Sequence, residues 1–536
     1  MSRIPRAAVV GLLLIPFVAG AFVIQERGAQ SGARLFDQVL GIVADRYVDS
    51  VDVGALYEKA ARGLIAQLKD PYAELYTPKQ LELFNQNTGG FYAGVGMMIE
   101  DQHGNITVTK VFPHTPAAEA SIMTGDQIVY VDTFNVRGHA WKTDSVSAHL
   151  KGPPGTKVSA KFVRPGITDP FTVPFVRRVV RIPAVEYAMM LDNKTAYIYV
   201  QQFNETAAEE VATALQRLTA EGAKSLVLDL RGNGGGYLDQ ALEMTNLFIP
   251  KGKEIVSVRG RGVPPQSAST EQAALVPTLP MIVLTDGYTA SASEIVAGAL
   301  QDHDRAVLLG TTSFGKGLVQ TKFDLDGGYA IKLTTAKWYT PSGRSIQKER
   351  TLTDDGQLVE VHPDSLETDS ARKARPKFRS DAGRVVYGGG AITPDIYVPY
   401  DTLTTPEQKL ARELFKGGLE AALQIDAYAL EMKSKVKPDF VVTPEMRDNL
   451  YQRFTKHGVV LDRKDYDAGS RYIDRTLDGK ISEFAFGDST AKRREVPEDT
   501  QLMKAIDILK KGSTTKELLA LAATMPGGAA AKPKQP

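Results

Sequence analysis

Two serines and a lysine stand in a spacing that could support nucleophilic chemistry. Ser291 and Ser293 begin an apolar helical pattern, and Lys316 follows between Gly315 and Gly317. A serine beside a neutral amine can attack a carbonyl carbon, because the amine accepts the hydroxyl proton. The flanking glycines carry no side chain that would keep the lysine away from a neighbouring segment. The same lysine could instead bind a phosphate group.

The phosphate-binding alternative fails on its neighbours. The stretch GTTSFGKG, residues 310–317, nearly matches the loop GxxxxGK[ST], but Gly317 stands where that loop needs a hydroxyl for magnesium. The LVQTKFDL that follows has the composition of a strand rather than of the required helix. RGNGGGYL, residues 231–238, fails the dinucleotide pattern GxGxxG at Tyr237. Neither stretch predicts a nucleotide site.

Other hydrolase templates fail as well. The seven histidines form no HExxH pair, and no GxSxG stretch occurs. A triad using Asp302 and His303 is disfavoured, because a helix from Ser291 would carry His303 roughly 15–18 Å away at about 1.5 Å per residue. A serine activated by lysine remains. A lysine works as a base near pH 7 only when desolvation lowers its pKa from about 10.4 toward roughly 7–8.

The surroundings of Ser291 favour catalysis but leave a structural alternative open. A helix beginning there would present unpaired N–H groups and the positive end of its dipole to an oxyanion. The turn of residues 234–236 offers further N–H groups after a neighbouring strand, where open α/β sheets place ligands. However, Ser291 and Glu294 also fit a capping box, in which the serine serves only the helix end.

Composition bounds the function classes. The chain has 536 residues, with 64 Lys and Arg against 63 Asp and Glu and a net charge of +1, so no nucleic-acid partner is expected. The absence of cysteine excludes disulfides, thiolate nucleophiles and zinc–cysteine sites. No stretch predicts a cofactor or a metal site.

The N-terminus has the pattern of an export signal. Arg3 and Arg6 precede an almost unbroken apolar run, residues 7–24. The run approaches the length of about 17–25 residues that spans a bilayer, so a retained membrane anchor fits as well as a cleaved signal peptide. A buried core helix is the third interpretation. We expect the chain after residues 1–27 to lie in the periplasm or cell envelope.

The elements that must position the serine and the lysine follow from hydrophobic periodicity. Residues 28–87 predict short helices, and residues 88–178 predict short strands separated by glycine and proline turns. Residues 179–400 alternate strands with helices, which predicts an α/β layer with parallel strands. Residues 401–536 predict amphipathic helices and end in a disordered-looking tail.

Six stretches of the chain resemble the carboxyl-terminal processing, or tail-specific, serine proteases. They are LKDPYAELYTP (68–78), DLRGNGGG (229–236), TASASEIVAGALQD (289–302), GTTSFGKGLVQ (310–320), KWYTPSGRSIQ (337–347) and GGGAITPDI (388–396). The resemblance covers about residues 35–400. It implies a multidomain α/β fold, with a crotonase- or ClpP-like protease core over 179–400, an inserted PDZ domain over 88–178, an N-terminal helical region over 28–87 and a C-terminal helical extension over 401–536.

The resemblance also assigns catalytic roles. Ser291 matches the nucleophile, Lys316 the general base and Gln320 the residue that orients the lysine, which leaves Ser293 a structural hydroxyl. Three supporting positions follow: the backbone N–H groups of Ala292 and Gly236 as the oxyanion hole, and Asp302 as an aspartate implicated in activity. No cofactor is implied.

Substrate selection is implied in the same way. In the PDZ domain, backbone N–H groups of one short loop would bind the terminal carboxylate of a peptide. That loop consists of Gly94, Val95, Gly96 and Met97. Where the family usually has an arginine, before the turn that couples the PDZ domain to the core, this chain has Lys151. Lysine cannot reproduce the bidentate fork of arginine.

The predicted function is a serine endopeptidase that processes or degrades envelope proteins from unfolded C-terminal tails. The alternative is a PDZ-bearing, peptide-binding scaffold with little catalytic activity. The helices of residues 401–536 could drive homo-oligomerisation, bind an adaptor, or pack on the core.

Overall fold

The computed structural model describes residues 32–525, apart from residues 103, 138–140, 165–166, 262, 354–357 and 361–373. The predicted export signal, residues 1–27, lies outside the described residues, as does the C-terminal tail from residue 526. In the described part of the chain, no helix is long and apolar enough to cross a membrane. The chain divides into two compact units, residues 1–77 with 322–334 and residues 78–321 with 335–536.

The first unit combines helices with one strand pair. Residues 32–46 are helical, and α2 spans Val53–Ala66. β1, Glu74–Tyr76, pairs antiparallel with the first residues of β18, Ala330–Tyr339. The helices agree with the prediction. β1 was not predicted, because a strand of 3 residues that is defined by its partner has no periodicity of its own.

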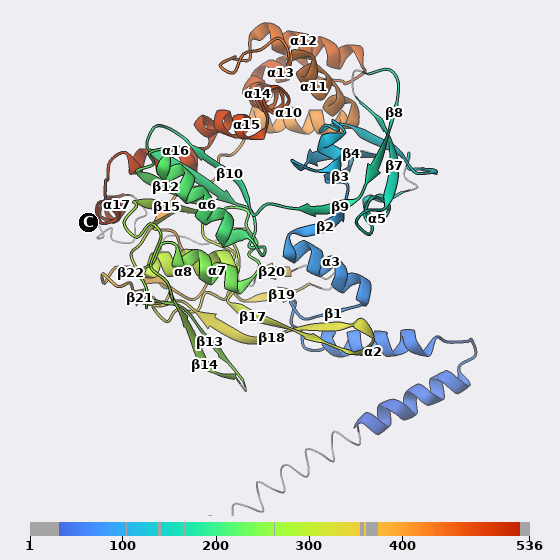
Figure 1. Ribbon diagram of the computed structural model, residues 1–536, viewed down its shortest axis with the longest axis vertical. Coiled ribbons are helices and arrows are strands. Elements are labelled where there is room, and N and C mark those ends of the chain that lie inside the picture. Colours follow the sequence, from blue (N-terminus) through green and yellow to red (C-terminus); the bar gives the residue numbers. More distant parts are fainter. Residues whose placement is uncertain are drawn as a thin grey trace, which may run out of the picture. The chain divides into compact units, whose positions relative to one another are not determined.

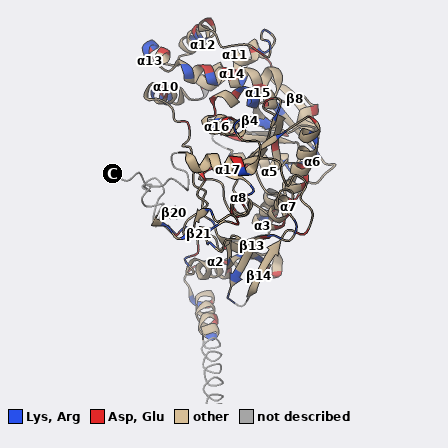
Figure 2. Cartoon of the chain, turned by 90° about the vertical axis from the view of Figure 1, so that its left-hand side faces the viewer, with Lys and Arg blue, Asp and Glu red and all other residues tan. Residues whose placement is uncertain are grey.

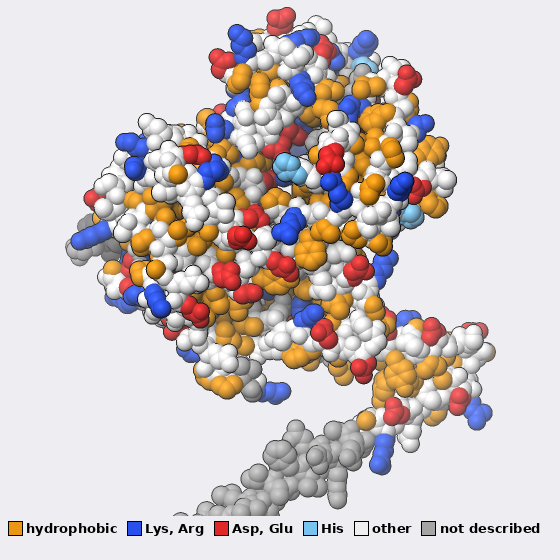
Figure 3. All heavy atoms as spheres, in the orientation of Figure 1, with side chains coloured by type: hydrophobic (Ala, Val, Ile, Leu, Met, Phe, Trp, Pro, Cys, Tyr) orange, Lys and Arg blue, Asp and Glu red, His pale blue; other side chains and the backbone are white. Residues whose placement is uncertain are grey.

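Apolar side chains remain at the surface of this unit (Figure 3). Leu35, Val39 and Ile42 recur at helical spacing and are 62%, 53% and 63% exposed. One stripe of the helix at residues 32–46 is therefore exposed to solvent.

In the second unit, the β-rich segment forms a sheet of short strands with two helices. The strands are β3 (Met97–Gln102), β4 (Asn105–Val111), β5 (Gln127–Val131), β6 (Phe134–Asn135), β7 (Lys157–Val163) and β8 (Phe171–Val176). They are ordered β3-β4-β5-β7-β8, with β6 paired to β5. The helices are α4 (Pro116–Glu119) and α5 (Thr143–Leu150). A separate pair, β2 (Phe91–Gly94) and β9 (Arg178–Arg181), joins the two ends of the segment.

A six-stranded sheet forms the centre of the second unit (Figure 1). Its strands, in spatial order, are β10 (Val185–Met190), β11 (Thr195–Val200), β12 (Ser225–Asp229), β15 (Met281–Thr285), β16 (Val307–Gly310) and β23 (Ile396–Tyr397). β10 is antiparallel to β11, and the other neighbours are parallel. The continuous apolar runs of β12 and β15 are buried throughout, as expected for parallel strands covered on both faces. The predicted α/β class is confirmed.

Helices cover both faces of this sheet. On one face, Leu226 and Leu228 pack in a cluster with α6 (Ala207–Ala220), α7 (Leu238–Asn246) and α8 (Ala292–Asp302). Val227, which points the other way, packs with α16 (Thr500–Leu509) and α17 (Thr515–Thr524). Figure 1 shows α16, in red, beside β12 and β15, and α17 contacts β16. The C-terminal residues therefore supply one layer of the central domain.

A second sheet carries the segment after the lysine. It contains β13 (Glu254–Gly260), β14 (Val263–Ser269), β17 (Leu318–Asp324) and β18. β17 is the strand predicted for LVQTKFDL. Two small hairpins, β19–β20 (Arg350–Leu352, Leu358–Glu360) and β21–β22 (Lys377–Arg379, Val385–Tyr387), lie in the polar stretch that follows β18.

The predicted C-terminal extension has two parts. The helices α10 (Thr405–Lys416), α11 (Gly418–Met432), α12 (Pro444–Lys456), α13 (Arg463–Ala468) and α14 (Ser470–Phe486) share a core of their own. Figure 2 shows basic and acidic side chains interspersed over these helices. α15 (Asp488–Glu495) and the short η3 (Val496–Glu498) lead from this bundle to α16 and the central sheet.

Candidate active site

Ser291 lies at the sharp turn between β15 and α8. Its φ is 57°, in the left-handed region that a residue with a side chain rarely adopts. Asp286 builds the turn by accepting hydrogen bonds from the N–H groups of Tyr288 and Thr289, both at 2.9 Å. The Thr289 hydroxyl donates to the carbonyl of Leu230, the residue after β12. The half-buried Ser291 therefore stands at the carboxyl ends of β12 and β15, where α/β sheets place their sites.

Residues 231–236, which we name the glycine loop, pack directly against this serine. Gly235 and Gly236 have φ angles of 95° and 148°, which favour glycine. A Cβ atom at Gly235 would lie 2.8 Å from the Ser291 Cβ and 2.9 Å from the Ala292 nitrogen. Only glycine at this position allows so close an approach.

The N–H groups of Gly236 and Ala292 are those predicted to form the oxyanion hole. Phe203 donates its N–H to the Gly235 carbonyl at 2.9 Å and accepts the Tyr237 N–H at 2.8 Å, so the Gly236 N–H points away from this bridge. Ala292 is the first residue of α8, where N–H groups have no intrahelical acceptor. Among the described residues, neither N–H donates a hydrogen bond. Two such donors beside a serine can stabilise an oxyanion.

Residues 313–317, which we name the lysine loop, present Lys316. The Lys316 Nζ donates to Gln320 Oε1 at 3.1 Å, and Gln320 lies on β17. Trp338 holds the lysine backbone by donating its Nε1–H to the Lys316 carbonyl at 3.1 Å. The structure thus brings together the predicted base and the residue predicted to orient it.

The two glycines beside the lysine are required by close packing. Gly315 has a φ of 84°, and a Cβ there would lie 2.6 Å from the Lys348 Cγ. A Cβ at Gly317 would lie 2.9 Å from the Gln347 nitrogen. Side chains at either position would displace the lysine loop.

Glu294 ties the serine helix to the lysine loop. Its carboxylate accepts from the N–H groups of Ser291, Gly315 and Lys316, at 2.9, 2.7 and 2.8 Å, and from the Ser313 hydroxyl. Burial raises the pKa of Glu294, and these hydrogen bonds oppose that rise. The capping box predicts only the contact with Ser291, because the remaining donors lie in a loop about twenty residues away.

Asp302 lies apart from the serine, at the last residue of α8. Its carboxylate pairs with the fully buried Arg344 at 2.7 Å and accepts the Ser342 N–H at 3.0 Å. His303 contacts Asp381 at 2.9 Å. No hydrogen bond among the described residues joins Asp302 to the Ser291 end of the helix, and its part in activity stays a prediction.

The predicted carboxylate-binding residues lie together between β2 and β3. Gly94 ends β2, and Met97 begins β3. Val95 between them is buried, and Gly96 has a φ of 93°. A Cβ at Gly96 would lie 2.2 Å from the Thr115 Cβ. These four residues therefore form one tight turn at the start of an edge strand.

An arginine reaches the turn that follows Lys151, although the sequence places lysine there. Arg177, between β8 and β9, donates to the Thr156 hydroxyl at the end of this turn at 3.0 Å, and to the carbonyls of His149 and Leu150 before Lys151 at 2.7 and 3.2 Å. Lys151 itself lies over the Tyr92 ring, 5.2 Å from its centroid. Burial lowers the pKa of Lys151.

Comparison with known proteins places this site in a family. A profile of peptidase family S41 matches residues 194–358. The carboxy-terminal processing protease CtpA of Bacillus subtilis (strain 168) is 34% identical over 346 residues, which cover 64% of this chain and 73% of that protein. A carboxy-terminal-processing protease of Bartonella bacilliformis is 36% identical over 317 residues, covering 58% of this chain and 72% of that protein. The chain belongs to the carboxy-terminal processing proteases.

Two solved structures are similar in part. The photosystem II D1 C-terminal processing protease is 28% identical, with a TM-score of 0.34, and covers 58% of this chain and 89% of that chain. A PDZ domain of a carboxy-terminal protease from Vibrio cholerae, solved with a peptide, is 26% identical, with a TM-score of 0.16 over 17% of this chain and 98% of that chain. This carboxy-terminal processing protease is a serine protease, the class that the name of a probable CtpA-like serine protease of Staphylococcus aureus (strain COL) also gives.

Proposed function

We propose that the protease cleaves peptide bonds with Ser291 as nucleophile and Lys316 as general base. The Lys316 amine accepts the Ser291 hydroxyl proton as Oγ attacks the scissile carbonyl carbon. The N–H groups of Gly236 and Ala292 hydrogen bond to the oxyanion that forms. Lys316 then gives its proton to the leaving amine. Water then attacks the carbonyl carbon of the acyl-enzyme. Lys316 accepts a proton from this water and returns it to the Ser291 Oγ, which releases the new carboxyl terminus.

The contacts of Glu294 carry this proposal. One carboxylate accepts the N–H of Ser291 at 2.9 Å and the N–H of Lys316 at 2.8 Å. The backbone of the proposed nucleophile and that of the proposed base are therefore bound to the same carboxylate, which is fully buried. A capping role alone would explain the first contact but not the second.

Gln320 supports a neutral amine. Its Oε1 accepts from Lys316 Nζ at 3.1 Å, which orients the lysine without adding negative charge. A carboxylate at this position would instead favour the ammonium form, which cannot accept a proton.

The identity of the nucleophile is tested with two alanine variants, one at Ser291 and one at Ser293. Ser291→Ala should lose labelling by a fluorophosphonate probe and reduce cleavage by at least about 10⁴-fold. Ser293→Ala should keep substantial activity, because the Asn233 carbonyl that accepts the Ser293 hydroxyl at 3.0 Å also accepts the Ala290 N–H at 2.9 Å, which the variant retains. Both should melt like the wild type within a few degrees. Cleavage that survives in Ser291→Ala and not in Ser293→Ala would assign the nucleophile to Ser293.

The substrates are unfolded C-terminal tails of envelope proteins. β3 is an edge strand of its sheet, so an extended peptide can add to it as the next strand. The turn of residues 94–97 immediately precedes β3, which gives a terminal carboxylate access to its N–H groups. A folded terminus cannot enter as a strand. The PDZ domain of residues 88–178 therefore selects flexible, apolar tails.

This selection is tested with one substrate protein in three forms. The first form ends in apolar residues, the second in two aspartates, and the third in an amidated apolar terminus. The first should be cleaved fastest, because the other two remove the apolar contact or the carboxylate charge. Equal rates would take the PDZ domain out of the selection step.

The location and the remaining domain limits belong to the same proposal. Residues 1–27 export the enzyme to the periplasm or cell envelope, as a cleaved signal or as an anchor, and residues 179–400 form the protease core. Of the helices after residue 401, those of the bundle α10–α14, which share a core of their own, would bind a second copy or an adaptor. Cell fractionation with sequencing of the mature N-terminus is the test, and an intact Met1 on a cytosolic protein would contradict it.

A further inference from the structure

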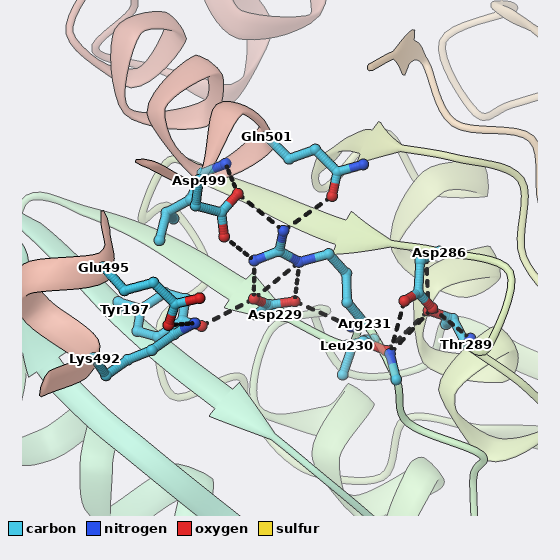
Figure 4. Close-up of polar contacts among 12 residues, drawn as sticks. Tyr197, Asp229, Leu230, Arg231, Asp286, Thr289, Lys492, Glu495, Asp499 and Gln501 are labelled. Atoms are coloured by element: carbon cyan, nitrogen blue, oxygen red, sulfur yellow. Dashed lines mark hydrogen bonds and ion pairs between the residues drawn. The ribbon is translucent and has the colours of Figure 1, made fainter. Parts of the chain in front are cut away.

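A buried ion cluster joins the glycine loop to the C-terminal helices (Figure 4). Arg231 donates to both carboxylate oxygens of Asp229, at 2.9 and 2.6 Å, and to both of Asp499, at 3.0 and 2.7 Å. It also donates to Gln501 Oε1 at 2.9 Å. The side chains of Arg231, Asp229 and Asp499 are 16%, 2% and 13% exposed. One guanidinium therefore bridges the end of β12 and the start of α16.

The C-terminal side of this cluster is fixed in its own right. Asp499 caps α16 by accepting the Leu502 N–H at 2.9 Å. Gln501 donates its amide to the Val398 carbonyl at 2.8 Å, beside β23. Burial raises the pKa of Asp499, but the hydrogen bonds and charge of Arg231 outweigh this and hold it below its usual value. Asp499 is therefore an ionised, oriented partner for the arginine.

Asp499 bears on the glycine loop because the residue that it holds, Arg231, is the first residue of that loop. Glycine has almost no steric preference for one peptide orientation, so a glycine-rich loop can rotate its N–H groups unless its ends are held. Asp286 holds the N–H of Gly232 with both carboxylate oxygens, at 3.0 Å each. The Arg231 side chain holds the preceding residue. Losing that hold frees the first residue of the loop, so the contacts of Asp286 with Gly232 and of Phe203 with Gly235 would have to orient the Gly236 N–H alone.

We infer that Asp499 and Gln501 are positioning residues for the active site. Through Arg231, they keep the glycine loop in the conformation that presents the Gly236 N–H to the oxyanion. This inference rests on the proposed function, in which that N–H stabilises the transition state. The last helices of the chain then complete the active site, although residues after 400 lie outside the stretches that carry the family resemblance.

The test compares helix-cap variants in the full-length enzyme. Asp499→Ala removes a cap and the contact with Arg231. Asp462→Ala is the matched control, because Asp462 caps α13 of the same C-terminal region and, among the described residues, its exposed carboxylate accepts from the N–H groups of Lys464 and Asp465 alone. Each variant is titrated with a fluorophosphonate probe, and kcat and KM for an unstructured peptide are expressed per titrated site.

Asp499→Ala should lower kcat per site about 10–100-fold with KM within twofold, because an oxyanion contact acts mainly in the transition state. Asp462→Ala should lower the melting temperature comparably and leave kcat per site within twofold of the wild type. A purely structural Asp499 would change the melting temperature and the titratable fraction but not kcat per site. Equal kcat values for the two variants would overturn the inference.

A third variant covers the case in which Asp499→Ala does not fold. Asp499→Asn keeps an equivalent helix cap but loses the charge and one acceptor for Arg231. It should lower kcat per site about 3–10-fold, and an unchanged kcat would overturn the inference. Ser291→Ala is measured in parallel. If it remains active, the proposed function fails, whereas an inactive Ser291→Ala beside a fully active Asp499→Asn defeats only the present inference.

Discussion

The lysine loop and the glycine loop flank the same serine but are anchored in different ways. The lysine loop binds Glu294, which lies on the serine's own helix, and all the hydrogen-bond donors to this carboxylate are neutral groups. The glycine loop is held at its first residue by the side chain of Arg231, whose charge lies between two carboxylates. The second of these, Asp499, comes 268 residues after the arginine.

This difference assigns the two halves of the chemistry to different parts of the chain. In the proposed mechanism, proton transfer between Ser291 and Lys316 depends on α8, because Glu294 on this helix accepts the N–H groups of both residues. Of the two proposed oxyanion donors, the Gly236 N–H depends through Arg231 on α16, which packs on the opposite face of the sheet from α8. Proton transfer should therefore be lost only when the protease core is disrupted. Oxyanion binding should also weaken when the C-terminal helices are changed.

The largest loss of activity is expected from substitutions of Lys316, which remove the proposed base and leave the contacts that hold the two loops in place. Lys316→Arg and Lys316→Ala should each lower kcat/KM by at least about 10⁴-fold, measured with a fluorogenic peptide. Arginine keeps a positive charge at every usable pH and has no acceptor for the serine proton. Melting temperatures should stay close to the wild type. An active Lys316→Arg enzyme would contradict the general-base role.

Breaking the lysine-loop anchor should have the next largest effect. Glu294→Gln turns one acceptor oxygen into a donor, so two of the four donors to this residue lose their acceptor. A hydrogen bond to a charged group contributes about 1.5–3 kcal/mol. We expect kcat/KM to fall about 10²–10³-fold, together with a lower melting temperature in calorimetry.

Glu407→Gln is the control for this substitution. Glu407 is also a buried glutamate in a capping box, where it accepts from the N–H and the hydroxyl of Thr404. It contacts neither loop. The variant should lose stability but keep its kcat per titrated site, and an equal loss of kcat in both variants would mean that Glu294 acts only through stability.

The sequence predicts part of the role of Glu294, which holds the lysine loop, and nothing of the role of Asp499, which holds Arg231. The serine and the lysine are predictable because the motifs that contain them are short and continuous. The capping box predicts the contact of Glu294 with Ser291, but its contacts with the lysine loop depend on the tertiary fold. Nothing in the sequence around Asp499 marks it as the partner of Arg231, since an aspartate before a helix predicts a cap and no more.

The same limit applies to the fold. The buried apolar runs of β12 and β15 are enough to predict parallel strands. α16 was predicted only as one amphipathic helix among several. Periodicity shows that a helix buries one face, and it does not show which surface covers that face. The division of residues 401–525 into a separate bundle and a layer of the central sheet is therefore found only in the structure.

A smaller and reversible effect should follow when charge is added at Gln320. Gln320→Glu places a carboxylate beside the Lys316 amine and favours the ammonium form. Activity near pH 7 should fall about tenfold, and the pH optimum should move upward by about one to two units. Recovery at high pH distinguishes this variant from Lys316→Arg. An unchanged pH profile would remove Gln320 from the control of the base.

The smallest expected effect separates the two anchors by their response to acid. The pKa of Asp499 is lowered in the folded protein, so its contribution to stability is fully present above the unfolded value of about 3.9. That contribution is lost as pH falls through the lower, folded pKa. The difference in unfolding free energy between wild type and Asp499→Asn, from urea titrations, should therefore stay constant from pH 7 to about pH 5 and shrink below about pH 4.

Glu294 should respond with the opposite sign. Burial raises its pKa in the folded protein, so the folded state takes up this proton at a higher pH than the unfolded state does. As pH falls through the raised value, the wild type should gain stability relative to Glu294→Gln, until the unfolded state is protonated as well. Opposite slopes for the two variants would show that a desolvated carboxylate holds the lysine loop and an ion pair holds the glycine loop. Parallel slopes would mean that both carboxylates have the same electrostatic surroundings. They would contradict the conclusion that the two loops are held by different kinds of interaction.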